Sequence, residues 1–254
     1  MKLALSNFAW DNPDSEKIFN IIKLNGFNQI EGVLTKLNDW ENITLDTILT
    51  YKKTLDDYQI KITSLQSLFY NFKCPNITEK ELFISHFKTL INYSKILSVN
   101  VLVFGSPNLR KKIVGWEKIV SDIFKELDNL LNKTNIEICI EPNSKIYGGE
   151  FFVTIDEIVE FIKKNKLKNI KTMIDTHNLQ LEGYDPIIEL NKHYNYISHI
   201  HISEVNLTPI INYESHTQFS NEIKKLGYNK TITYEILKCD NIETEIKKFV
   251  EIYN

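Results

Sequence analysis

Short runs of apolar residues alternate along the chain with longer segments in which apolar residues recur every three or four positions. The short runs have the length of strands, and Val101-Leu102-Val103-Phe104 is apolar throughout, as in a parallel sheet buried on both faces. The longer segments have the spacing of amphipathic helices. The predicted strands span residues 3–5, 27–30, 60–65, 101–104, 136–140, 170–174, 196–202 and 231–234. The predicted helices begin near residue 15 and then span 45–57, 79–98, 115–131, 155–165, 186–192, 217–226 and 242–253.

This alternation predicts an α/β fold with eight strand–helix units. Right-handed crossovers between parallel strands give either an open, doubly wound sheet or a closed barrel. The chain has 254 residues, and a closed (β/α)8 barrel needs about 250. No linker, internal repeat or low-complexity segment divides the sequence. We therefore expect a single TIM-barrel domain over residues 1–254.

Composition and charge narrow the function classes. The chain carries 30 basic and 33 acidic residues, a net charge of -3, so nucleic acid is not an expected partner, because phosphate binding depends on clustered cations. No apolar run approaches the ~18 residues of a membrane span. The three cysteines are far apart and odd in number, which predicts neither a disulfide framework nor a cysteine metal site. A reducing, cytoplasmic location fits best.

Four side chains with metal-binding capacity stand at the ends of the last four predicted strands: Glu141, Asp175, His201 and Glu235. In a barrel of this kind, the carboxyl ends of the strands form the active site. Three oxygen donors and one imidazole suit Mn²⁺, Mg²⁺, Co²⁺ or Zn²⁺. Any one of these residues alone has a plainer explanation as a helix cap or a loop acceptor. Their common position on successive strands favours one divalent metal.

The sequence phrases around these residues resemble the xylose-isomerase-like superfamily of sugar isomerases and epimerases. The matching phrases are Cys139-Ile140-Glu141-Pro142-Asn143, Met173-Ile174-Asp175-Thr176-His177, His199-Ile200-His201-Ile202-Ser203-Glu204 and Tyr234-Glu235. The resemblance implies an isomerase or epimerase of a sugar, sugar phosphate or sugar acid. It implies one divalent cation bound by Glu141, Asp175, His201 and Glu235. It also implies that Glu141 and Glu235 face each other across the substrate, and that two copies can pair as a homodimer through outer helices.

The chemistry agrees with that arrangement. A metal that bridges a carbonyl and its neighbouring hydroxyl polarises both and stabilises the enediolate formed when the α-proton leaves. One carboxylate, Glu141 or Glu235, removes the proton and another group returns it. Return to the same carbon gives an epimer, return to the neighbouring carbon gives an isomer, and loss of a hydroxyl gives dehydration. The sequence leaves these outcomes open.

The sequence departs from the family pattern at two positions that bind the substrate in the epimerases. The epimerases carry a histidine three residues after the sixth-strand aspartate, whereas His177 follows Asp175 by only two. They also carry an arginine six residues after the metal histidine, where this chain has Leu207. The grip on the substrate must therefore differ, which argues against a free ketohexose.

Several residues near the strand ends are candidates for substrate binding: His177, Arg110, Gln66, Asn143 and His216. A guanidinium at Arg110 could bind a phosphate or carboxylate, Gln66 could bind sugar hydroxyls, and Asn143 begins a segment that could form a lid. His216 is placed on the loop after the seventh strand. The plainer alternatives are a surface arginine that starts a helix and polar residues that cap loops.

Glu31 and His199 have open roles. Glu31 ends the second predicted strand and could contact substrate or cap a turn. His199 lies two residues before His201, so simple strand alternation places both on one side.

Two other function classes are weighed against the isomerase or epimerase. A metal-dependent phosphodiesterase of the apurinic-endonuclease type uses three zinc ions and needs histidines at the ends of strands two to four, where the sequence reads Glu31-Gly32, Leu65-Gln66 and Phe104-Gly105. A non-catalytic sugar-binding barrel would have lost metal ligands, and all four are present.

Overall fold

The computed structural model describes all 254 residues and shows eight parallel strands that close into a barrel in sequence order. The strands are β1 (Lys2–Ser6), β2 (Gln29–Gly32), β3 (Lys61–Leu65), β4 (Val101–Phe104), β5 (Glu137–Ile140), β6 (Ile170–Asp175), β7 (Ile197–Ile202) and β8 (Thr231–Tyr234). Closure comes from the pairing of β8 with β1, for example Tyr234 opposite Leu5. The predicted TIM barrel is confirmed.

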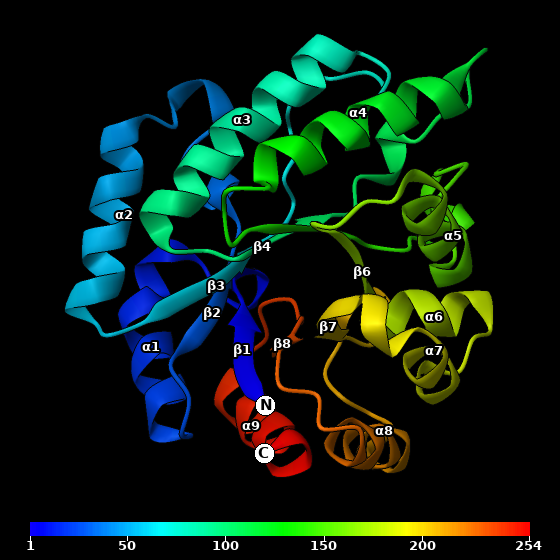
Figure 1. The fold of residues 1–254 in the computed structure, drawn as a ribbon. Helices are drawn as coiled ribbons and strands as arrows, with labels where there is room; N and C mark the ends of the chain where they lie inside the picture. The colour runs from blue at the N-terminus through cyan, green and yellow to red at the C-terminus, as the bar shows by residue number, and fades with distance from the viewer.

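The helices form an outer layer around the barrel, and the two chain ends lie close together beside β1 and α9 (Figure 1). The helices are α1 (Ser15–Leu24), α2 (Leu45–Asp57), α3 (Lys80–Leu97), α4 (Trp116–Leu131), α5 (Ile155–Asn165), α6 (Thr176–Glu182), α7 (Pro186–His193), α8 (Tyr213–Lys225) and α9 (Ile242–Tyr253). None of them is long and apolar enough to cross a membrane.

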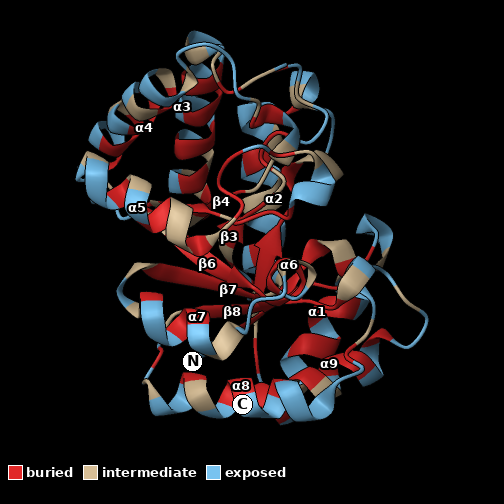
Figure 2. Cartoon of the chain, turned by 90° about the vertical axis from the view of Figure 1, so that its right-hand side faces the viewer, coloured by how far each residue is buried: buried red, intermediate tan, exposed pale blue.

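Local sequence explains where the helices start. Thr44 caps α2 by accepting a hydrogen bond from the backbone N–H of Thr47, and Thr154 caps α5 in the same way through Glu157. Such caps satisfy N–H groups that have no partner inside the helix. The inner face of α4 buries Val120, while polar residues cover its outer face, as the burial colours show (Figure 2).

The hydrophobic core lies mainly between the barrel wall and the helices, where 65 buried residues form one cluster. A separate cluster of Val103, Cys139 and Met173 comes from adjacent strands β4, β5 and β6. Because successive side chains of a strand point to opposite faces, residues two positions beyond Cys139 and Met173 share their inward direction. Those residues are Glu141 and Asp175, so the barrel interior leads directly to the candidate metal ligands.

Three elements differ from the sequence prediction. Strand β2 spans Gln29–Gly32 rather than 27–30, because the polar residues Gln29 and Glu31 belong to the strand. Helix α6 was not expected; it has seven residues and begins at a cap provided by Asp175. Helix α8 starts at Tyr213, four residues early, because Asn212 caps it through the N–H of Ser215. His216 therefore lies in a helix and not in a loop.

His86 on α3 is a buried titratable group outside the strand-end region. Its ring stacks on Phe72 with centroids 3.9 Å apart, and Nε2 lies 2.7 Å from the carbonyl oxygen of Leu68. A carbonyl only accepts, so Nε2 donates. Burial lowers the pKa of His86 from 6.5 to about 4.

We expect this histidine to make the fold sensitive to acid. Between pH 6.5 and 4 the unfolded chain binds a proton that the folded chain does not, so His86 removes stability as the pH falls through that window. From pH 7 to 4.5 the loss is about 2 kcal/mol. His86→Gln keeps a hydrogen-bond donor for the Leu68 carbonyl but does not titrate. Urea unfolding should therefore show that the variant loses less stability than the wild-type protein between pH 7 and 4.5. An equal pH dependence in both proteins would contradict the prediction.

Candidate metal and substrate site

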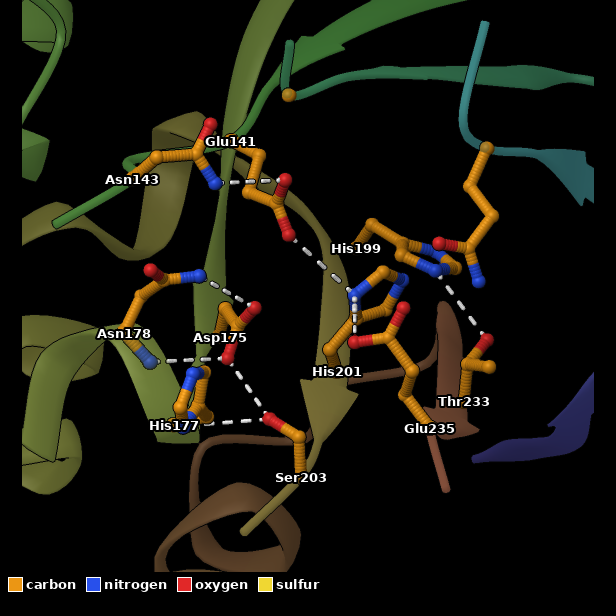
Figure 3. A network of polar contacts seen from close by, with 12 residues as sticks. Glu141, Asn143, Asp175, His177, Asn178, His199, His201, Ser203, Thr233 and Glu235 are labelled. Carbon is orange, nitrogen blue, oxygen red and sulfur yellow. Dashed lines mark hydrogen bonds and ion pairs between the residues drawn. The ribbon is translucent and has the colours of Figure 1, made fainter. Parts of the chain in front are cut away.

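The four predicted ligands converge at the carboxyl ends of β5 to β8 (Figure 3). The ligand atoms of Glu141, Asp175 and His201 all lie within 4.8 Å of one another. Nδ1 of His201 is 3.6 Å from Oε1 of Glu141 and 3.4 Å from Oε2 of Glu235. Three carboxylates from three different strands thus surround one imidazole nitrogen.

The position of Glu141 depends on a small neighbour and a polar one. A methyl group at Gly105, just after β4, would overlap Oε2 of Glu141. The same oxygen accepts a hydrogen bond of 2.9 Å from Nδ2 of Asn143. Together they direct the other oxygen, Oε1, toward His201.

Asp175 is the most firmly held of the carboxylates. Its Oδ1 accepts hydrogen bonds from the Asn178 backbone N–H (3.1 Å) and from Ser203 Oγ (2.7 Å), and its Oδ2 accepts one from Asn178 Nδ2 (2.8 Å). Burial, together with the nearby charge of Glu141, raises the pKa of Asp175 to about 6. A cation in contact with both carboxylates would remove that repulsion.

A second group of titratable residues lies beneath these ligands. Glu31 of β2 is fully buried; its Oε1 is 2.7 Å from Nε2 of His201 and its Oε2 is 2.9 Å from Nε2 of His199. These are close ion-pair contacts without aligned hydrogen-bond geometry. Burial alone would raise the pKa of Glu31, but the two histidines lower this pKa well below its ordinary value.

Glu31 fixes which nitrogen of His201 faces the other carboxylates. Burial by itself would lower the pKa of His201, but the charges of Glu31 and Glu235 raise it well above 6.5. Because Nε2 faces Glu31, Nδ1 is left facing Glu141 and Glu235. A carboxylate behind a ligating histidine is a common supporting arrangement in metal sites.

Two sets of three side chains can therefore hold a metal: Glu141, Asp175 and His201, or Glu31, His199 and His201. The second set is completely buried, and Glu31 is already paired with both histidines. Only the first set includes side chains that line an open pocket, Glu141 and Asp175, so it is the one that a substrate can reach.

This strand-end pocket has a volume of about 440 Å³. Its lining residues are Glu141, Tyr147, Asp175, His177, Asn178, Asn206, Leu207, Glu235 and Leu237. A larger depression of about 910 Å³ lies at the opposite end of the barrel and contains none of the four candidate ligands. The smaller pocket is therefore the one that is lined by candidate metal ligands.

His177 and Tyr147 meet at the edge of this pocket. The Tyr147 hydroxyl lies 2.6 Å from Nε2 of His177. His177 sits in the first turn of α6, and its backbone N–H donates to Ser203 Oγ at 3.1 Å. The structure thus brings His177 to the site, with a tyrosine partner that comes from the short helix Lys145–Tyr147.

Gln66 and Asn143 lie near the ligands but do not line the pocket. Asn143 orients Glu141, as described above, and Gln66 donates from Nε2 to Ser6 Oγ at 2.7 Å. Both side chains are buried. Their contacts are therefore with the protein itself.

The structure does not bring the Arg110 guanidinium or His216 to the pocket. Arg110 is fully buried and donates to the carbonyl oxygens of Glu141 (3.0 Å), Phe152 (3.1 Å) and Phe104 (2.8 Å), as well as to that of Gly105. Burial lowers its pKa to about 9. Arg110 is therefore neither the predicted substrate-binding residue nor the surface arginine of the alternative; it supports the backbone behind Glu141.

His216 is buried in α8. Its Nδ1 is 2.7 Å from the Tyr253 hydroxyl and its Nε2 is 3.1 Å from Oε1 of Glu204. These contacts join α8 to α9 and to the end of β7. The shape of the pocket therefore does not depend on His216 directly.

Several pocket residues were absent from the sequence candidates: Tyr147, Asn178, Asn206, Leu237 and the supporting Ser203. Alternation along β7 placed His199 and His201 on the same side, and both contact Glu31. No sequence signal pointed to Asn178, which the unpredicted helix α6 brings to Asp175, or to Ser203, which follows β7.

Comparison with known proteins places the chain in a family. The family model described as xylose isomerase-like TIM barrel matches residues 19–251, so the chain belongs to this family. A comparison with curated protein sequences gives no match.

Solved structures with the same fold include enzymes of different activities. A 3-keto-D-glucoside 4-epimerase from E. coli superposes with a TM-score of 0.77 at 15% identity, covering 99% of this chain and 97% of the other. D-psicose 3-epimerase from Clostridium cellulolyticum, solved with D-tagatose, gives 0.76 at 18% identity, covering 99% and 91%. A family 2 AP endonuclease from Brucella melitensis gives 0.80 at 14% identity, covering 100% of both chains.

Glu31→Gln should destabilise the fold by about 3 kcal/mol, because it leaves His201 buried without its partner charge. Glu137→Gln is the matched control, because Glu137 lies 3.9 Å from Lys230 and both side chains are partly exposed. This substitution should lower the free energy of unfolding by less than about 1 kcal/mol. Urea unfolding measures both. If the two substitutions lower the free energy of unfolding equally, the buried contact between Glu31 and His201 does not stabilise the fold more than a surface ion pair.

Gly105→Ala should displace the Glu141 carboxylate, because the added methyl group overlaps its flexible end. The free energy of unfolding should change by no more than about 1 kcal/mol, since a side chain rather than backbone must move. A crystal structure of the variant would show the displaced carboxylate. In Gly149→Ala the new atom lies 3.3 Å from Pro107 Cβ, and Glu141 should stay in place. An unmoved Glu141 in Gly105→Ala would contradict the prediction.

Proposed function

We propose that this protein is a divalent-metal-dependent isomerase or epimerase of a sugar or sugar derivative, with Glu141 and Glu235 as its acid–base pair. One observation carries the proposal: three carboxylates and the Nδ1 of His201 converge at the floor of an open pocket. The sugar epimerases among the solved structures of the same fold support the class of reaction.

The donor set fits a divalent cation. Glu141, Asp175 and Glu235 bring three negative charges together, and no lysine or arginine lines the pocket to balance them. Nδ1 of His201 is buried without a hydrogen-bond partner. Carboxylate oxygens with one imidazole suit Mn²⁺, Mg²⁺, Co²⁺ or Zn²⁺. When bound, the cation would polarise a carbonyl and its neighbouring hydroxyl.

Within this set, the residues divide into fixed and reactive groups. Asp175 has both oxygens engaged in three hydrogen bonds, so it serves as an anchor. Glu235 has no such partner, and Glu141 has only the bond from Asn143. We assign proton removal and return to Glu141 and Glu235, which approach Nδ1 of His201 from different strands.

The groups at the pocket edge position the substrate. His177 and Tyr147 form a polar pair that can donate to and accept from sugar hydroxyls. Return of the proton by the opposite carboxylate to the same carbon gives an epimer, and return to the neighbouring carbon gives an isomer. Both outcomes need only the two glutamates and a substrate held between them.

An AP endonuclease shares the fold as well, but no residue of the site favours either of the other two classes. A phosphodiesterase with three metals needs further ligands, yet both candidate sets share His201, and Gln66 and Gly105 stand where histidines would be needed. A non-catalytic sugar-binding barrel has no need of paired carboxylates at the floor of the pocket.

Glu235→Gln should abolish turnover, since the change removes a carboxylate that both contacts the cation and transfers the proton. We expect at least a hundredfold loss of solvent-deuterium incorporation into the substrate, while the unfolding transition stays cooperative. Glu137→Gln, at the opposite end of the barrel, serves as the control and should retain full exchange. Normal exchange in Glu235→Gln would exclude the proposed mechanism.

The second test measures how much metal the protein binds. Elemental analysis of protein purified without chelators should give about one divalent ion per chain, and His201→Ala should lose it. Three zinc ions per chain would indicate the phosphodiesterase class instead.

A further inference from the structure

No lysine or arginine side chain lines the strand-end pocket. The nine lining residues include three carboxylates. Arg110 is the only arginine in the chain, and its guanidinium is buried among backbone carbonyls. Lys238, next to the lining residue Leu237, is paired with Asp11 and Asp14 at 2.8 and 3.1 Å. Lys145 is exposed and does not line the pocket.

Two leucines form an apolar wall on one side of the pocket. Leu207 comes from the loop after β7 and Leu237 from the loop after β8; with Tyr147 they are the three hydrophobic residues among the nine that line it. The Leu237 N–H donates to the Leu207 carbonyl at 3.0 Å, so the two loops are tied together. Leu237 is 50% exposed, so part of this wall is open to an incoming molecule.

Leu207 holds its place through a strained backbone. It has φ +53°, and Asn206 before it has φ +61°. Two successive non-glycine residues in the left-handed region are uncommon, and a leucine there is more so. Such strain persists where the surroundings enforce it and clusters at binding sites. Here the Leu207 N–H donates to the Glu204 carbonyl at 2.8 Å, which secures the turn.

From these features we propose that the substrate is not a fully hydroxylated ketohexose but an uncharged ketose whose end remote from the reacting carbons is apolar, such as a terminal deoxy carbon. Its carbonyl and hydroxyl end would lie among Glu141, Glu235 and His201, and its methyl end against Leu207 and Leu237. This inference rests on the function proposed above and narrows its substrate class.

The physical reason is a difference in solvation. The charged end of a terminal phosphate or carboxylate, remote from the proposed metal, would leave water for a part of the pocket that has no lysine or arginine to pair with it. A hydroxyl against two leucines would lose hydrogen bonds that the wall does not replace. A methyl group gains contact area there and loses nothing.

The experiment measures solvent-deuterium incorporation by the metal-loaded protein across the full set of ketohexose stereoisomers. Each is supplied in three forms: terminally deoxygenated, unmodified and terminally phosphorylated. We expect the deoxy form to have a kcat/KM about tenfold above the unmodified sugar, with the phosphate lowest. A preference for the phosphate would overturn this inference and leave the proposed function standing. No exchange with any form would overturn both the proposed function and the inference that rests on it.

A charge placed on the wall tests the same idea from the protein side. Leu237→Lys should raise kcat/KM for the phosphorylated sugar about tenfold, because a cation at the pocket mouth attracts the anion, and should lower it for the deoxy sugar. Ile211→Lys is the control, since Ile211 is 78% exposed and does not line the pocket. If both variants leave the ratio of the two substrates unchanged, the apolar wall does not select the substrate.

Discussion

The contact between Glu31 and His201 is the interaction on which the site depends. A histidine ring has two nitrogens, and the role proposed for His201 requires that Nδ1 face Glu141 and Glu235. Glu31 achieves this from the second strand, on the far side of the barrel interior, by occupying Nε2. The contact also balances charge, because a buried carboxylate and a buried imidazole would each be unfavourable alone. His199 completes the balance at the other oxygen of Glu31.

The remaining supports act on the backbone rather than on the substrate. Arg110 ties together the chain segments that follow β4 and β5 through several carbonyl oxygens, one of them that of Glu141 itself. Gly105 leaves the space that the Glu141 side chain fills. Ser203 and Asn178 hold Asp175 from two other segments. The ligands are therefore placed by groups buried behind them, which is the arrangement that limits their motion before a substrate arrives.

The sequence was sufficient for the barrel and for the convergence of the four candidate ligands, because both follow from periodic patterns. Strands such as β4 and β8 have the predicted bounds, and Glu141, Asp175, His201 and Glu235 follow the inward alternation. The errors arose where contacts distant in sequence decide the outcome. Arg110 resembles a surface residue until the carbonyls of Phe104 and Phe152 surround it. His216 resembles a loop residue until Asn212 caps the helix. Residues after β6 form a helix because Asp175 caps it, although they show no helical period.

Chemistry and specificity come from different parts of this fold. The carboxylates and His201 stand on strands or directly after them, where the barrel fixes their direction, whereas Tyr147, Leu207 and Leu237 stand on loops. Loops on a rigid scaffold can change without disturbing the positions beneath them. On the proposed function, the strands carry the proton-transferring groups, while the loops after β5, β7 and β8 determine which substrates the pocket accepts. In this chain those loops place leucines and no lysine or arginine at the pocket, which is the reason for expecting an uncharged substrate.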